Sequence, residues 1–310
     1  MKCKVCKAEA VVGLRSHNAA FCAQCFLAFF RRQLLKGIES QNLLSPNDKV
    51  LVAVSGGKDS LSLMLELKEL GFNASGLFID LGIPESANAA RRHVENFCAQ
   101  HELPLQVVDL AAENLAIPDV KKALHRPVCS ACGKIKRYFF NRIAQAGGYD
   151  AIATGHNLDD EIGRLMSNVL RWDCAYLGDQ GPLLPAEPGF TRKIKPLWRL
   201  TEFETANYAF LRNIPHHASA CPYSQGASFA TIKNWFHKLD AKMPGRKLDF
   251  YQGFLNRGRP QFANCQGGSS VSLHPCPACG SPTSSSGTCG ICRIRDAVAK
   301  FKVEKTKWTL

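Results

Sequence analysis

Residues 49–60 read Lys-Val-Leu-Val-Ala-Val-Ser-Gly-Gly-Lys-Asp-Ser, and an apolar-periodic run, Leu61 to Leu70, follows at once. A β-branched run that ends in small residues and continues with a helical period predicts a strand, a tight turn and a helix. Gly56 and Gly57 lack Cβ atoms, so this backbone can approach a ligand closely. The unbonded N–H groups at the start of the helix favour an anion in the same place. The segment therefore predicts a phosphate-binding loop.

The spacing of this loop differs from two common phosphate-binding loops. A Walker loop needs four residues between its glycines, and a dinucleotide fingerprint needs three spaced glycines. Here the two glycines are adjacent, and Asp59 lies inside the loop, which also carries the hydroxyls of Ser55 and Ser60. The segment resembles the PP-loop of ATP pyrophosphatases, which split ATP into AMP and pyrophosphate. An ordinary glycine-rich turn is the structural alternative.

Composition sets limits on the class of protein. A chain of 310 residues predicts a core domain with small appendages. No apolar run approaches the ~20 residues that span a membrane, and the start of the chain lacks the apolar segment of a signal peptide. We therefore expect a cytoplasmic protein without a membrane partner. The net charge of +13 favours a polyanion such as RNA or DNA as partner, although charge alone also fits a solubilising surface.

Paired cysteines lie near both ends of the chain. A reducing compartment disfavours disulfides, so these pairs indicate metal ligands. Four thiolates complete a tetrahedral zinc shell and leave no open position for water. Zinc is favoured over a redox Cys-x-x-Cys because each group contains two pairs. We therefore predict two structural Zn²⁺ ions, held by Cys3, Cys6, Cys22 and Cys25 and by Cys276, Cys279, Cys289 and Cys292.

Strands and helices alternate between these two groups. We expect strands at Val50–Val54, Ala74–Ile79, Leu105–Leu110 and Ala151–Thr154, and helices at Ser60–Leu70, Glu85–His101, Ile135–Ala146 and Asp159–Trp172. This alternation predicts an α/β fold with a parallel sheet covered on both faces. Ligands bind at the carboxyl ends of such strands. The loop at Ser55, the strand end at Asp80 and residues 155–161 should therefore meet at one pocket.

Three carboxylates follow the fourth strand, at Asp159, Asp160 and Glu161. Mg²⁺ is usually held by one or two carboxylates together with phosphates, which fits a site near ATP. Acidic residues are also favoured in the first turn of any helix. We expect both roles among these residues and assign the functional one to Asp160.

A further Cys-x-x-Cys, Cys129 and Cys132, has no second pair nearby. It opens a predicted helix, where the dipole and basic neighbours lower a thiol pKa. Cys221, in Cys-Pro-Tyr-Ser, also precedes a predicted helix. Three such thiols could ligate three irons of a [4Fe–4S] cluster, or serve as a persulfide carrier and its resolving partner.

The alternatives for this trio are a structural thiol pair or a third zinc site, for which His216 or His217 is close enough to Cys221 to supply a fourth ligand. The remaining cysteines are Cys98, Cys174 and Cys265, and their isolation indicates packed or incidental thiols.

Taken in order along the chain, these motifs resemble the TtuA/TtcA family of tRNA 2-thiolation enzymes. The two flanking zinc modules match the TtuA branch, because the TtcA branch lacks them. The resemblance implies a PP-loop core of the adenine nucleotide alpha hydrolase type. It divides the chain into an N-terminal zinc finger (1–30), a PP-loop catalytic domain (31–260) and a C-terminal zinc finger (261–310).

The resemblance also implies roles for individual residues. The phosphates of ATP would contact Ser55, Gly56, Gly57, Asp59 and Ser60, and the nucleoside would lie near Ala53, Val54, Ile79 and Gly155. A [4Fe–4S] cluster would be held by Cys129, Cys132 and Cys221. Lys136 and Asp160 would flank ATP and the reacting base.

The implied reaction is ATP-dependent 2-thiolation of a tRNA uridine. Adenylation of the C2 oxygen makes it a good leaving group, and a sulfur nucleophile then displaces AMP. The implied partners are tRNA, a ubiquitin-like sulfur carrier with a thiocarboxylate terminus and a second copy of the chain. Two alternatives are a PP-loop enzyme that amidates an adenylated small molecule and a zinc-dependent RNA-binding protein with a degenerate nucleotide fold. The sequence does not decide between uridines 34 and 54.

Overall fold

A central sheet of six strands, in the order β5-β4-β3-β6-β8-β7, organises the computed structural model. The structure describes residues 1–83, 86–124, 128–216, 221–223, 228–265 and 272–307. The strands of the sheet are β3 (Lys49–Val54), β4 (Asn73–Asp80), β5 (Leu105–Asp109), β6 (Ala151–Thr154), β7 (Leu183–Leu184) and β8 (Arg192–Ile194). All pairs in this sheet are parallel except β7 with β8.

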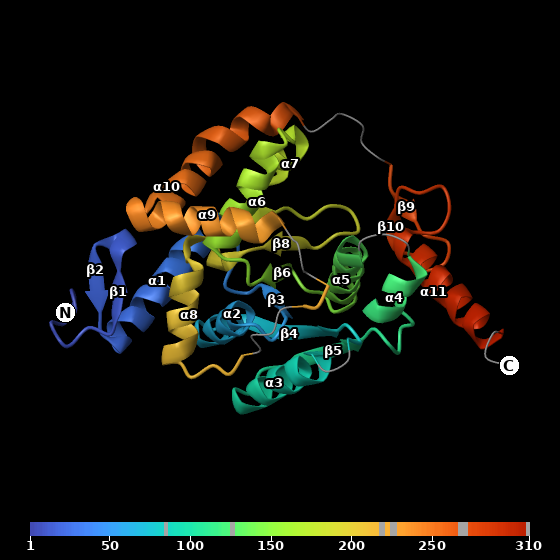
Figure 1. The fold of residues 1–310 in the computed structure, drawn as a ribbon, viewed down its shortest axis with the longest axis horizontal. Coiled ribbons are helices and arrows are strands. Elements are labelled where there is room, and N and C mark those ends of the chain that lie inside the picture. The colour runs from blue at the N-terminus through green and yellow to red at the C-terminus, as the bar shows by residue number, and fades with distance from the viewer. Residues whose placement is uncertain (84–85, 125–127, 217–220, 224–227, 266–271, 308–310) are drawn as a thin grey trace.

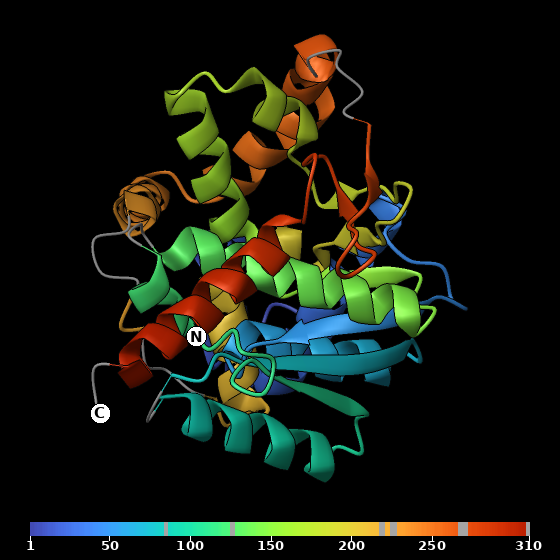
Figure 2. The same ribbon diagram turned by 90° about the vertical axis from the view of Figure 1, so that its right-hand side faces the viewer.

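The helices lie on both faces and at the ends of the sheet (Figures 1 and 2). They are α1 (Ala23–Ser40), α2 (Lys58–Glu69), α3 (Ser86–Gln100), α4 (Ile117–Ala123), α5 (Val128–Ala146), α6 (Leu158–Leu170), α7 (Cys174–Asp179), α8 (Glu202–Leu211), α9 (Ser228–Lys242), α10 (Arg246–Gly253) and α11 (Gly290–Lys307). Short helical turns are η1 (Arg15–His17), η2 (Pro196–Arg199), η3 (Phe254–Gly258) and η4 (Arg259–Cys265). No helix in the described ranges is both long and apolar enough to cross a bilayer.

The alternating side chains of β3 divide the interior into two cores. Val50 and Val52 belong to one core, together with residues from α1, α2, α3 and α6. Leu51 belongs to the other, together with residues from α4, α5 and α11. Successive side chains of a strand point to opposite faces, so a strand that is apolar throughout is covered on both sides. Figure 2 shows α3 below the sheet and α5 and α11 above it.

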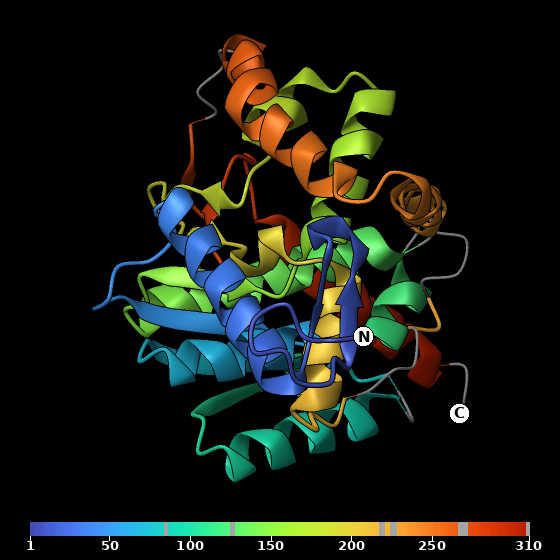
Figure 3. The ribbon, with the colours of Figure 1, turned by 90° about the vertical axis from the view of Figure 1, so that its left-hand side faces the viewer.

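Each terminal cysteine module is attached to a different core. The hairpin of β1 (Val12–Leu14) and β2 (Ala19–Phe21) packs beside α1 and α8 (Figure 3), and Cys3 is buried in the first core. The hairpin of β9 (His274–Pro275) and β10 (Pro282–Thr283) precedes α11, and Cys276 is buried in the second core. Figure 1 shows the two modules at opposite ends of the molecule.

The expected alternation of strands and helices is confirmed, with differences at its boundaries. The strands expected from Val50, Ala74, Leu105 and Ala151 correspond to β3 to β6, and the helices to α2, α3, α5 and α6. Helix α5 begins at Val128 rather than Ile135, so Cys129 and Cys132 lie within its first turns. Glu85, the expected first residue of the second helix, lies outside the described residues. Strands β7 and β8 were not expected, because two and three residues are too few to give a periodic pattern.

Candidate active site

The PP-loop follows β3 and leads into α2, as the sequence predicts. Gly56 has a φ of +82°, a left-handed conformation that glycine adopts without strain. The Ser60 hydroxyl closes the loop, because its oxygen accepts a hydrogen bond from the Ser55 N–H at 3.1 Å and donates to the Gly57 carbonyl at 3.0 Å. The loop shape is therefore fixed by side chains at its two ends, and Ser55, Gly57 and Ser60 line an open space.

A second glycine, at the end of β6, makes room for this loop. A Cβ atom on Gly155 would lie 2.7 Å from the backbone nitrogen of Ser60, a distance that real Cβ atoms do not show. Any side chain at position 155 would therefore displace the start of α2. The adjacent parallel strands β3 and β6 bring the two glycine positions together.

These strand ends enclose a cavity of about 420 Å³, within the size range of about 300–1,000 Å³ found for small-molecule sites. Its floor and walls are largely apolar, with Phe78 and Ile79 from the end of β4. Most of the residues assigned to ATP or catalysis line it. They are Ala53, Val54, Ser55, Gly57, Asp59, Ser60, Ile79, Lys136, Gly155 and Cys221.

Four assigned residues are not among the walls of this cavity: Gly56, Cys129, Cys132 and Asp160. Gly56 lies in the loop itself, between Ser55 and Gly57. Asp160 instead lines a neighbouring cavity. The two cysteines lie one helical turn apart on α5, the helix that also carries Lys136.

Asp59 links the loop to other elements. Its carboxylate accepts hydrogen bonds from the Thr205 hydroxyl at 2.5 Å, from the Asn157 amide at 3.2 Å and from Lys58 at 3.1 Å. A carboxylate has no proton to donate to phosphate, so Asp59 orients the donors around the loop. Burial opposes the charge on Lys58, but Asp59 and Glu202 outweigh it and raise the lysine pKa.

The first turn of α6 carries three carboxylates, and each faces a different lysine. Asp159 pairs with Lys247 at 2.6 Å, Asp160 with Lys233 at 2.6 Å and Glu161 with Lys195 at 2.8 Å. Asp159 and Glu161 are 3% and 1% exposed, so they are structural, and the Tyr251 hydroxyl also donates to Glu161. Burial lowers the pKa of Lys195 despite the attraction of Glu161.

Asp160 is the accessible carboxylate of the three. It also forms a capping box with Asn157 at the start of α6. We expected the helix-capping role and the functional role to fall on different acids, but Asp160 both caps the helix and is accessible to solvent. The lysines opposite this turn come from α9, α10 and the end of β8, and sequence reasoning did not identify them.

The central trio of cysteines lies beside the nucleotide cavity and consists of Cys129, Cys132 and Cys221. The Cys129 thiol donates a hydrogen bond to the carbonyl oxygen of Tyr223 at 3.3 Å. This contact places α5 next to the segment that contains Cys221. The pKa of Cys132 is raised, mainly by burial. The charge of Lys136 lowers it and those of Cys221 and Cys129 raise it, but burial is the largest effect. Cys129 and Cys221 are exposed. Helix α5 therefore presents two thiols toward a third that lines the ATP-sized space.

The spacing of this trio separates it from a zinc site. Within the described part of the chain, ligand atoms all within 4.8 Å of one another occur in the two terminal groups of four cysteines, and the trio is spaced more widely. The His216 ring nitrogen Nδ1 lies 3.0 Å from the Ile214 carbonyl oxygen, so that ring is turned to its own backbone. His217, the other proposed ligand, lies outside the described residues.

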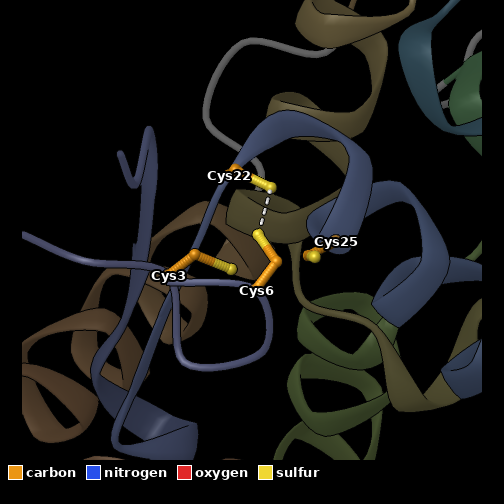
Figure 4. A group of neighbouring side chains, drawn as sticks. All are labelled: Cys3, Cys6, Cys22 and Cys25. Carbon is orange, nitrogen blue, oxygen red and sulfur yellow. Dashed lines mark hydrogen bonds between the residues drawn. The ribbon is translucent and has the colours of Figure 1, made fainter. Parts of the chain in front are cut away.

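The two terminal groups have the dimensions of zinc sites. Tetrahedral bonds of about 2.3 Å place the sulfurs about 3.8 Å apart. The observed separations are 3.5 Å for Cys6 and Cys22 (Figure 4), 3.6 Å for Cys279 and Cys289, and 3.9 Å for Cys276 and Cys292. Backbone hydrogen bonds, from the Cys6 and Cys289 amides above all, lower the pKa of Cys3 and of Cys276 to about 6. Both groups therefore fit a four-thiolate metal.

The remaining cysteines divide into two kinds. Burial raises the pKa of Cys98 to about 11, as expected of a packed thiol. Cys265 instead hydrogen-bonds Cys174, which raises its pKa. The interpretation of these two as incidental, isolated thiols is wrong, because α7 packs against η4 and brings them side by side.

Comparison with known proteins identifies the family. Residues 22–215 match the PP-loop domain, and residues 2–27 match the N-terminal LIM domain of the 2-thiouridine synthetase TtuA. A tRNA-5-methyluridine(54) 2-sulfurtransferase of Thermus thermophilus is 40% identical over 96% of this chain and 92% of its own. The chain belongs to the TtuA family of tRNA 2-sulfurtransferases.

One further relative supports this membership, and one solved structure shares the fold. The enzyme of the same name from Thermotoga maritima is 38% identical over 97% of this chain and 98% of its own. The solved structure of the U34-tRNA thiolase NcsA from Methanococcus maripaludis, with its [4Fe-4S] cluster, has a TM-score of 0.77 at 24% identity and covers 96% of both chains. The TtuA family and the PP-loop fold are thus the ones expected from the motifs.

Proposed function

We propose that this TtuA-family protein replaces the C2 oxygen of uridine 54 in tRNA with sulfur, at the expense of ATP. The observation that carries the proposal is the shared cavity: Cys221 and Lys136 line the same space as the PP-loop. An activating site and a set of thiols thus open onto one another. Relatives named for position 54 reach 40% and 38% identity, whereas the structure named for U34 reaches 24%, which favours position 54.

The first step needs a site that stabilises departing pyrophosphate. A uracil C2 oxygen attacks the α-phosphorus of ATP, and the bond to pyrophosphate breaks. Ser55 and Ser60 hold the shape of the loop through hydrogen bonds to each other, and the N–H groups at the start of α2 would face the phosphates, so stabilising the developing charge would require no rearrangement. Lys136, from α5, adds a positive charge to the wall of the same cavity.

The second step needs a sulfur nucleophile beside the adenylated base. Sulfur attacks C2, and AMP leaves with the former C2 oxygen. A [4Fe–4S] cluster held by Cys129, Cys132 and Cys221 would supply an open iron on which sulfur can be presented. Three thiols with a wider spacing than a single-ion site fit such a cluster, and the same thiols could alternatively carry a persulfide.

Asp160 would act at the edge of the nucleotide site. We propose that Mg²⁺ bound with ATP takes the place of Lys233 at this carboxylate, because both are cations and Asp160 is the accessible acid of its turn. The two terminal groups would each hold a Zn²⁺ ion. We further propose that sulfur is supplied by a ubiquitin-like carrier and that the protein forms a homodimer. The proposed location is the cytoplasm.

A single reconstitution tests this function. Protein purified without oxygen is incubated with unmodified tRNA, ATP and inorganic sulfide, and the digested tRNA is examined by nucleoside mass spectrometry. We expect a 2-thiouridine derivative at position 54 with release of AMP. Cys221→Ser should remove the product while ATP binding persists, and Cys265→Ser, a control thiol outside the cavity, should retain it. Thiolation that survives both Cys129→Ser and Cys221→Ser would contradict the assigned centre.

A further inference from the structure

A second, larger cavity of about 840 Å³ lies next to the nucleotide cavity. The two share one residue, His156, which follows β6 and whose Nδ1 is 2.8 Å from the Thr154 hydroxyl. The second cavity lies between α6 and α7, which pack together above the sheet in Figure 1, with Arg137 of α5 on its wall. A molecule in this cavity would therefore be in contact with the wall of the ATP site.

The charge of this second cavity is unbalanced. Arg137, Arg164 and Arg171 line it, and within the described ranges no acidic side chain forms an ion pair with any of them. Arg171 donates to the Asn168 amide oxygen at 2.9 Å, a neutral partner that orients the guanidinium without cancelling its charge.

Three acids, Asp160, Glu161 and Asp179, line the same wall, and the first two are paired with lysines. Asp160 pairs with Lys233, and Glu161 pairs with Lys195. The cavity therefore carries an excess of guanidinium groups, which favours binding of an anion. Guanidinium binds phosphate well because it presents two parallel hydrogen-bond donors.

Aromatic side chains mark the rim of the second cavity. Tyr176 of α7 lines it and is 64% exposed, and Trp172, just before α7, is 71% exposed. Unstacked bases of RNA pack on exposed aromatic rings, which favours a polynucleotide over a free phosphate or pyrophosphate. Arg164 and Arg171 are seven residues apart on one helix face or its end, about 10 Å by helical rise, so they can contact different phosphates.

We propose that this second cavity receives the tRNA segment that carries the target uridine. Arg164 and Arg171 bind its backbone phosphates, Tyr176 stacks on a base, and the target base passes His156 to enter the nucleotide cavity. The identity of the nucleic acid rests on the proposed function, whereas the binding role rests on the cavity itself.

Binding of unmodified tRNA to Arg164→Ala, Arg171→Ala and the double variant, measured by fluorescence anisotropy at several salt concentrations, tests the proposal. We expect affinity to fall about tenfold for each arginine. The slope of log affinity against log salt should fall by about one for each lost phosphate contact. The KM for tRNA should rise, while kcat at saturating tRNA and affinity for ATP stay unchanged. Tyr176→Ala should weaken binding about tenfold and Tyr176→Phe should not.

Arg92→Ala is the matched control, because Arg92 is exposed on α3 and lines neither cavity. Equal losses for Arg92→Ala and Arg164→Ala would overturn the proposal, since the effect would then be general electrostatics. Wild-type affinity in the double variant would also overturn it, as would weakened binding of pyrophosphate with unchanged tRNA binding. Binding through these arginines without formation of thiouridine would refute the proposed function and support the cavity.

Discussion

The terminal cysteines and the central pair Cys129 and Cys132 share the Cys-x-x-Cys spacing but differ in the distances between sulfurs and in their surroundings. Each terminal group brings four sulfurs within 4.8 Å of one another, and half of these cysteines are buried. The central trio is spaced more widely, has two exposed thiols, and adjoins the nucleotide cavity. A closed shell stabilises a fold, whereas an open set beside a ligand cavity can react. The surroundings of the motif, and not its spacing, separate structure from chemistry.

Matched serine substitutions give the largest expected contrast. Cys276→Ser removes a ligand from a closed shell, and because structural zinc contributes about 10–16 kcal/mol of apparent binding free energy, we expect a large drop in melting temperature. Cys129→Ser should abolish thiolation with little change in melting temperature, since that thiol is exposed. Thermal melting and the thiolation assay measure both. A large destabilisation by Cys129→Ser would erase the contrast.

Metal content provides the second contrast. Protein purified without chelator should hold about two zinc ions per chain, because two complete four-thiolate shells are present. Iron should follow the trio: Cys132→Ser should lose iron and keep zinc, and Cys289→Ser should lose about one zinc and keep iron. Elemental analysis of each variant measures this. Fewer than one zinc per chain in the wild type would contradict the closed sites.

The first turn of α6 contains a similar contrast between a buried carboxylate, Asp159, and a more accessible one, Asp160. Lys247→Met leaves Asp159 buried without its cation, and we expect the free energy of unfolding to fall by about 3–5 kcal/mol. Lys233→Met unpairs the more accessible Asp160, and the expected loss is about 1 kcal/mol or less. Chemical denaturation of both variants measures the difference. Equal losses would mean that Asp160 is as closed as Asp159.

Gly155→Ala should combine a moderate loss of stability with a specific effect on ATP binding. The new Cβ presses on the backbone of Ser60, and overpacking of about 1–3 kcal/mol at the loop weakens ATP binding about tenfold or more. Gly287→Ala is the control, because a Cβ there meets no atom within 4 Å. Isothermal calorimetry with a non-hydrolysable ATP analogue compares them. Unchanged affinity in Gly155→Ala would show that the loop can move away.

The sequence predicted the parts of the site that are local. The PP-loop, its strand and helix, and both four-cysteine groups are recognisable from short spacings, because their physics is decided within a few residues. The lysines opposite α6 were missed, since Lys233 and Lys247 are 73 and 88 residues away from their carboxylates and have the pattern of a solvated helix face. The pairing of Cys174 with Cys265 was missed for the same reason. The roles of the site residues and the division at residues 30 and 260 remain predictions.

The first turn of α6 has a consequence for how this sequence can change over generations. Asp159, Asp160 and Glu161 are adjacent in the chain, yet their cations come from α10, α9 and the end of β8. A lineage that loses Glu161 leaves the buried Lys195 without the acid it pairs with, and one that loses Asp159 leaves the buried Lys247 with Asp240, 3.9 Å away, as its remaining acid. Accepted substitutions should therefore occur in pairs, at 159 with 247 and at 161 with 195, while positions 160 and 233 drift more independently. Substitutions at positions 159, 160 and 161 should then be independent of one another, although the three positions are adjacent in the chain.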